Sequence, residues 1–156
     1  MKKINFLIAL ILVFITGIDY ANAIMTNQQA SNVRKTYQTY RYKLRTCSPY
    51  TYNVDGDPNI VRIEGIYNRR CLVRFLGYNN AIECNFKNDS LKKFISLMPP
   101  PNYYAKSLDE IINMSDKEID KMANAHTDYV MGVIFDDSIA KVCKSPNSEN
   151  KENNAQ

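Results

Sequence analysis

The side chains with the most chemistry to offer in this sequence are four cysteines and a single histidine, His126. The cysteines are Cys47, Cys71, Cys84 and Cys143. No two of them have the C-x-x-C spacing of a zinc site, and the sequence carries no glycine-rich phosphate loop and no G-x-S-x-G nucleophile motif. We therefore expect no metal and no other cofactor.

An apolar segment near the N-terminus indicates the compartment in which the cysteines reside. Two lysines precede an apolar run over residues 4–18, and Ala21-Asn22-Ala23 fits the small-x-small cleavage rule. The pattern predicts a signal peptide over residues 1–23, cut after Ala23, and a mature domain in the periplasm or outside a bacterial cell. The run is shorter than the roughly 20 residues of a membrane span, so no membrane contact is expected after cleavage.

Export into an oxidising compartment predicts that the four cysteines form two disulfides. Our first choice of pairing is Cys71–Cys84 with Cys47–Cys143. The alternatives join each of the central cysteines to one of the outer two, either as Cys47–Cys84 with Cys71–Cys143 or in the crossed version. Each link contributes roughly 3–5 kcal/mol to stability in the chain-entropy description, and the longer loop contributes more.

Residues 60–86 predict a three-stranded antiparallel meander, because apolar and polar side chains alternate between turn residues. A second hairpin centred at residues 77–78 places Cys71 opposite Cys84 on the apolar face. A three-residue connector in the first hairpin places Tyr67 beside Cys71. This register puts the apolar side chains of all three strands on one face.

The best catalytic set that the sequence offers lies on the outward face of this meander. Arg62, Glu64 and Arg74 are expected to be neighbours there, and a glutamate, an arginine and a histidine can cleave RNA by acid–base catalysis. The histidine would have to be His126, which lies on the apolar side of a predicted helix, where a buried structural histidine is expected. Alternating charges on neighbouring strands also stabilise a solvated sheet face. A small ribonuclease-like hydrolase is therefore the alternative function.

An amphipathic helix is predicted to begin at a capping box formed by Thr26 and Gln29 and to end near Pro49. Its apolar positions recur at helical spacing: Val33, Tyr37, Tyr40, Leu44 and Cys47. Its other side is basic, and the candidate binding residues there are Arg34, Arg41 and Arg45. Interleaved aromatic and basic residues resemble a polyanion-binding surface, although tyrosines packed on a sheet beside a solvated basic face explain the same pattern.

Further helices are predicted after the meander. The first begins with a cap at residues 88–90 and ends before the prolines at 99–101, which favour an extended polyproline segment. Capping boxes at residues 107–110 and 115–118 open a short helix and a longer one. Residues 145–156 are almost entirely polar and predict a disordered tail.

Charge is unevenly spread along the chain. Residues 24–93 carry 12 basic and 5 acidic side chains, whereas residues 94–156 carry 6 and 10. The excess in the first half suggests an acidic protein or an envelope polymer as partner and is too small to demand nucleic acid. We therefore predict a single disulfide-linked α+β domain over residues 24–144, with an N-terminal helix, a small antiparallel meander of three to four strands and two to three C-terminal helices on one face. The predicted function is non-catalytic binding.

Overall fold

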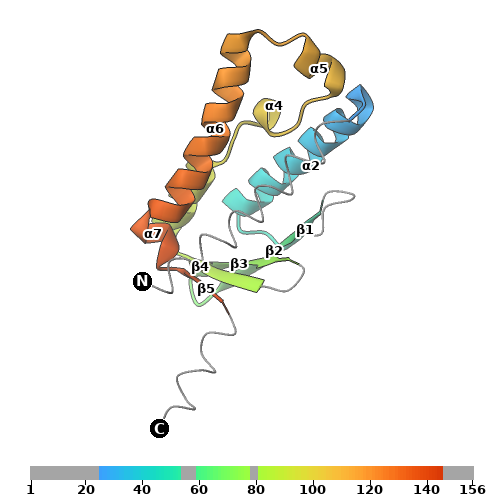
Figure 1. Ribbon diagram of the computed structural model, residues 1–156. Coiled ribbons are helices and arrows are strands. Elements are labelled where there is room, and N and C mark those ends of the chain that lie inside the picture. The colour runs from blue at the N-terminus through green and yellow to red at the C-terminus, as the bar shows by residue number, and fades with distance from the viewer. Residues whose placement is uncertain (1–24, 54–58, 78–80, 146–156) are drawn as a thin grey trace.

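The computed structural model describes residues 25–53, 59–77 and 81–145. At its base is a five-stranded antiparallel sheet in the order β1-β2-β3-β4-β5, and the helices gather on one face of it (Figure 1). The α+β fold predicted from the sequence is confirmed. The predicted signal peptide, and the predicted tail after its first residue, lie outside the described residues.

The strands are β1 (Tyr50–Asn53), β2 (Ile60–Tyr67), β3 (Arg70–Leu76), β4 (Ala81–Phe86) and β5 (Cys143–Lys144). The helices are α2 (Asn27–Arg45), α3 (Asn88–Leu97), α4 (Pro101–Tyr104), α5 (Leu108–Ile112), α6 (Asp116–Phe135) and α7 (Asp137–Ala140). The sequence did not predict β5, which is only two residues long and pairs with the middle of β4. None of the helices in the described ranges is long and apolar enough to cross a membrane.

Helix α2 begins with the predicted capping box. The hydroxyl of Thr26 accepts a hydrogen bond from the backbone N–H of Gln29, and the side chain of Gln29 accepts one from the backbone N–H of Thr26. The buried side chains of the helix are Ala30, Tyr37, Tyr40 and Leu44. Their spacing gives the helix one apolar face, as predicted. After Arg45 the chain turns toward β1, and Cys47 has a φ of 47°.

The other helix starts follow the sequence signals with one exception. The capping boxes at residues 107–110 and 115–118 are both present and open α5 and α6. The predicted cap of α3 is wrong, because Lys87 is the N-cap and makes no side-chain capping bond. Ser90 is instead buried in the first turn.

The proline segment at residues 99–101 is only partly extended, because Pro101 opens α4, where its fixed φ suits the first helical position.

The centre of the β3–β4 connection lies one residue later in the chain than predicted. Residues 77–80 separate the paired strands, so that Val73 lies opposite Cys84 and Phe86 lies opposite Cys71. The predicted register is therefore wrong by two residues. A shift of two preserves the alternation of faces, which is why both cysteines still lie on the buried side of the sheet.

A β-bulge interrupts the pairing of β2 with β3 near Glu64 and Gly65. Beyond the bulge, Ile66 rather than Tyr67 lies opposite Cys71. The predicted neighbourhood of Tyr67 and Cys71 is therefore wrong, because the two strands are joined by the two residues Asn68–Arg69 and not by the predicted three-residue connector. Tyr67 is consequently exposed.

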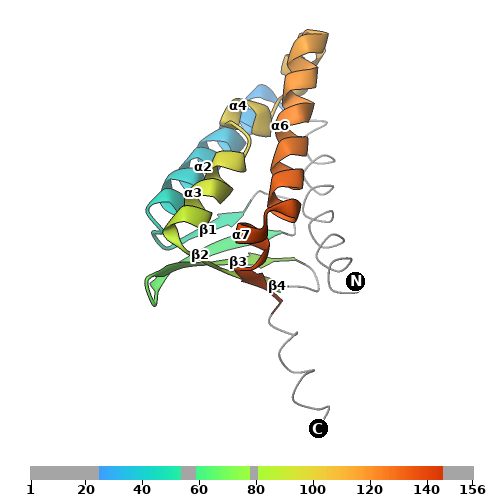
Figure 2. The same ribbon diagram turned by 90° about the vertical axis from the view of Figure 1, so that its left-hand side faces the viewer.

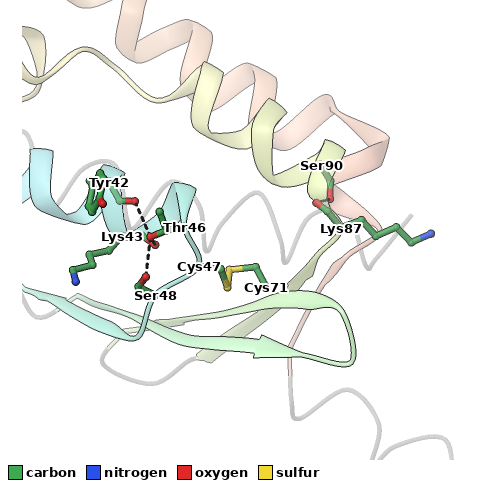
Figure 3. The surroundings of a disulfide bond; sticks show 8 residues. All are labelled: Tyr42, Lys43, Thr46, Cys47, Ser48, Cys71, Lys87 and Ser90. Atoms are coloured by element: carbon green, nitrogen blue, oxygen red, sulfur yellow. Dashed lines mark hydrogen bonds between the residues drawn. A yellow bond between two sulfur atoms is a disulfide. The ribbon is translucent and has the colours of Figure 1, made fainter.

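Each disulfide joins one cysteine of the β3–β4 hairpin to a residue outside that hairpin. Cys47 is bonded to Cys71 (Figure 3), and Cys84 is bonded to Cys143. The first choice of pairing is wrong, and the crossed alternative is the one present. The reason is the register: Cys71 and Cys84 are not opposite each other, whereas β5 places Cys143 directly opposite Cys84.

The core lies between the buried face of the sheet and the helices above it. Its most enclosed side chains are Leu44, Ile63, Val73, Cys84, Phe86 and Ile139. A cluster of tyrosines extends this core between α2, β1 and α4. The ring centroids of Tyr37 and Tyr104 lie 3.7 Å apart, and the hydroxyl of Tyr52 donates to the hydroxyl of Tyr104 at 2.9 Å. The cluster therefore links three elements that are distant in sequence.

We expect Gly65→Ala to lower the free energy of unfolding by roughly 1–3 kcal/mol. Gly65 has a φ of 110°, which residues with a side chain rarely adopt. An added Cβ would lie 3.5 Å from the Cγ of Pro49, which is an ordinary van der Waals contact. The cost is therefore backbone strain rather than a clash. Urea unfolding measures it. Ile66→Ala, at the exposed neighbouring position, should change stability by less than about 0.5 kcal/mol. Equal stability of the two variants would contradict this account.

Candidate functional site

The outward face of the sheet holds three residues of the predicted catalytic set. Nη1 of Arg74 lies 3.2 Å from Oε1 of Glu64 on β2, and its Nε lies 3.1 Å from Oε2 of Glu83 on β4. Arg62 lies opposite Arg74 in the register of β2 and β3. The two carboxylates thus offset the repulsion between neighbouring arginines, which is how a solvated sheet face is stabilised.

His126, the fourth residue of that set, lies on α6, on the helical side of the sheet (Figure 1). It is half-buried, and its Nε2 lies 2.8 Å from the carbonyl oxygen of Tyr103. Because a carbonyl oxygen only accepts, Nε2 carries the proton and donates it. The structure therefore places the imidazole in a link between α6 and α4 and does not bring it to Glu64.

Arg34 joins α2 to α5. Its Nη1 donates to the carboxylate of Glu110 at 2.8 Å and to the carbonyl oxygen of Ala105 at 2.9 Å. Burial raises the pKa of Glu110, but the hydrogen bonds from Arg34 and from Ser107 outweigh it and lower this pKa to about 2. The carboxylate is therefore charged at neutral pH, and Arg34 has an internal partner.

Arg41 forms one wall of a groove between α2 and α3. Its Nη1 lies 3.1 Å from the carbonyl oxygen of Pro99, and its Nη2 lies 3.5 Å from that of Ile95 near the end of α3. Cations near the end of a helix complement its unpaired carbonyl groups. The guanidinium carbon also lies 5.9 Å from the ring centroid of Tyr37, and the buried Nε has no hydrogen-bond partner among the described residues.

The α2–α3 groove has a volume of about 420 Å³. Arg45 and Lys92 are exposed at its sides, and Leu91 and Ile95 give it an apolar lining. Cations beside an apolar lining suit an acidic ligand that also carries apolar groups. The groove is therefore the strongest candidate binding surface in the described part of the chain.

Further cations lie at the same end of the molecule. Arg70 and Lys87 each adjoin the last pair of the β3–β4 ladder, Cys71 with Phe86, and Lys87 is the N-cap of α3. Figure 2 shows this end, where the C-terminus of α2, the start of α3 and the β2–β3 connection lie together. We call it the basic end, and it comprises Lys43, Arg45, Arg69, Arg70, Lys87 and Lys92.

The basic end has little internal charge compensation. The cations in the ion pairs between described residues are Arg34, Arg74, Lys93 and Lys141. Asp89, in the first turn of α3, contributes one negative charge near the six cations. The basic end therefore presents a positive potential to solvent and attracts anionic groups.

A second hollow, of about 380 Å³, lies on the outward side near β5. Its lining includes Arg70, Glu83, Lys141 and Lys144. Glu83 is already paired with Arg74, so the hollow extends the positive surface from Arg70 rather than forming an independent acidic site.

The predicted binding residues fall into two groups in the structure. Arg41 and Arg45 line the α2–α3 groove, whereas Arg34 lies in the joint with Glu110. Sequence reasoning missed five cations of the basic end: Lys43, Arg69, Arg70, Lys87 and Lys92. They come from the last turn of α2, a turn, a strand end, a helix cap and a helix side, so no single periodic pattern connects them. The strand register is the signal that relates Arg70 to Lys87.

All four cysteines are in disulfides, which form and persist in oxidising compartments outside the cytosol. In the described ranges, no three His, Cys, Asp or Glu side chains gather as a metal site requires. No family model, no curated protein and no solved structure gives a significant match to this chain.

Proposed function

We propose that this protein is an exported, non-catalytic domain that binds an acidic partner through its basic end. The observation that carries the proposal is the group of six cations with little internal compensation beside a groove with an apolar lining. Export is supported by the two disulfides and by the signal pattern of residues 1–23, with cleavage after Ala23 into the periplasm or the medium. The partner is then an acidic protein or envelope polymer.

The charge pattern supports recognition of an extended anionic surface. A single exposed ion pair contributes only about 0.2–1 kcal/mol, so one cation of the basic end would give little affinity. Six cations acting together raise the association rate and select against basic partners. Leu91 and Ile95 are only 6% and 7% exposed, so the groove offers a ligand apolar contact at its base and the cations supply most of the attraction.

The ribonuclease-like alternative has less support from the geometry. Arg74 holds the Glu64 carboxylate in an ion pair, and His126 donates its Nε2 proton to a backbone carbonyl on the helical side of the sheet. Acid–base catalysis needs both groups within reach of one substrate. No observation in the described residues favours that arrangement.

Binding of labelled poly-L-glutamate to residues 24–156 tests the proposed function. We expect binding that weakens with salt, and a loss of roughly 2- to 30-fold in Arg45→Gln/Lys92→Gln, from two exposed ion pairs. Fluorescence anisotropy at two salt concentrations measures both. Lys117→Gln/Lys121→Gln, at exposed positions near the start of α6, makes the same change in net charge and should leave binding unaltered. No binding at low salt, or equal losses in both double variants, would refute the proposal.

A further inference from the structure

Unusual backbone conformations gather around one hairpin of the sheet. Within the described ranges, the residues with positive φ are Cys47 at 47°, Gly65 at 110°, Asn68 at 49° and Arg69 at 63°. Gly65, Asn68 and Arg69 belong to the β2–β3 hairpin, and Cys47 is bonded to Cys71 at its base. Left-handed conformations in side-chain-bearing residues are costly, and their concentration in one place points to a function.

The tip of this hairpin, residues 66–70, exposes apolar side chains. Ile66 is 72% exposed and Tyr67 is 65% exposed. Ile66 lies opposite Cys71, which is only 4% exposed, so burial ends abruptly along the hairpin. In Figure 2 the β2–β3 connection extends beyond the helices that cover the sheet. The tip is therefore a projection with an apolar side chain on each face.

Covalent and backbone constraints give the tip a fixed shape. The Cys47–Cys71 disulfide ties β3 to the segment after α2 (Figure 3). Cys71, the cysteine on β3, lies only two residues after Arg69. The strands are joined by a two-residue turn, Asn68–Arg69, in which both φ angles are positive, as the twist of a hairpin requires. Glycine would fit the second position without strain, whereas the Cβ of Arg69 makes this left-handed conformation costly. The sequence thus keeps a cation at the turn despite its conformational cost.

We infer that the hairpin tip is a preformed plug that inserts into a concave cleft rimmed by carboxylates on a folded protein partner. The inference rests on the proposed function and names the kind of acidic partner. Ile66 and Tyr67 fill the apolar interior of the cleft, and Arg69 and Arg70 pair with the carboxylates at its rim. Tyrosine and arginine are the side chains that dominate binding energy at the centres of protein interfaces. A rigid tip also loses little conformational entropy on binding.

The shape and apolar content of the tip favour a protein over a lipid surface or a flexible polymer. Ile66 and Tyr67 offer less apolar surface than a myristoyl chain, and even such a chain anchors a protein only marginally to a bilayer. A flexible polyanion neutralises cations but offers no preformed cavity that covers both faces of the tip. A concave protein surface with carboxylates at its rim neutralises the cations and also covers both faces.

Site-specific crosslinking tests where the partner lies. A photoreactive phenylalanine analogue replaces Ile66, or Ile112 as the control, in cells that make the protein. The two positions match well, because Ile112 is 71% exposed and lies at the other end of the molecule, on α5. We expect a discrete protein adduct from position 66 that is absent from position 112 and is lost in Arg69→Gln/Arg70→Gln. The crosslinked peptide should border a cleft that contains acidic side chains.

Affinity measured with the purified captured protein completes the test. We expect Tyr67→Ala to weaken binding by at least about 30-fold and Ile112→Ser to leave it unchanged. Poly-L-glutamate binding separates the two proposals, because Tyr67→Ala keeps every cation and should bind this probe normally. Equal adducts from both positions, adducts to lipid or glycan, or no adduct while poly-L-glutamate still binds would overturn the plug and leave the proposed function standing. If the unaltered protein did not bind poly-L-glutamate, the proposed function itself would be refuted.

Discussion

Replacing Cys84 and Cys143 together by serine is expected to lower the free energy of unfolding by about 4 kcal/mol. The bond joins residues 59 apart in the sequence, and closing a long loop removes much conformational entropy from the unfolded chain. It also holds β5, which pairs with β4 at only two positions. Urea unfolding of the double variant, followed by circular dichroism, measures the loss.

The second disulfide provides the matched comparison. Cys47 and Cys71 are 24 residues apart, so Cys47→Ser/Cys71→Ser is expected to lose about 3.5 kcal/mol. The two loops follow one another along the chain, so the losses should add to about 7–8 kcal/mol, most of the stability of a typical domain. Peptide mapping without reduction should recover these two pairs. A peptide linking Cys71 to Cys84 would contradict the structure.

Alkaline pH is expected to unfold the protein steeply above about pH 10. Burial raises the pKa of four tyrosines well above the usual tyrosine value, and neighbouring tyrosines raise it further: Tyr37, Tyr40, Tyr52 and Tyr129. The folded protein therefore retains four protons that the unfolded chain releases near pH 10. Since the folded-state pKa values are the raised ones, stability is complete below pH 10 and falls above it by about 1.4 kcal/mol per tyrosine and pH unit, or about 5.5 kcal/mol for the four.

Tyr40→Phe isolates this effect. The ring of Tyr40 stacks on that of Tyr52 with centroids 4.7 Å apart, and phenylalanine keeps a ring there without the ionisable hydroxyl. We expect the slope of stability against pH to fall by about one quarter, measured by urea unfolding between pH 9 and 12 after short incubation. Tyr42→Phe makes the same chemical change at a position of α2 that is 62% exposed. A similar slope change in both variants would show that burial is not the cause.

Local signals in the sequence were sufficient for the start of α2, α5 and α6. The boxes formed by Thr26 with Gln29, and by the serines and glutamates at 107–110 and 115–118, act over three residues. Hydrogen bonds over so short a distance depend little on the rest of the fold. The spacing of Tyr37, Tyr40 and Leu44 likewise indicated the buried face of α2, because helical geometry fixes which side chains share a face.

Strand register could be predicted only as far as the faces. Alternation of apolar and polar residues identifies the side on which Cys71 and Cys84 lie, but a shift of two residues leaves that alternation unchanged. The centre of the β3–β4 connection, and the two-residue turn and bulge of the β2–β3 hairpin, decide the actual pairing, and the alternation does not reveal them. The error in register led directly to the error in disulfide pairing.

The sequence by itself determined the starts of α2, α5 and α6, the buried face of the sheet, the even number of cysteines and the excess of positive charge in the first half of the chain. Only the tertiary structure decided which cysteines bond and which cation-bearing elements come together. The C-terminus of α2, the β2–β3 connection and the start of α3, which carry the cations of the basic end, meet at one end of the molecule (Figure 2). Such meetings depend on long-range packing, whereas the patterns visible in a sequence reflect neighbours within a few residues.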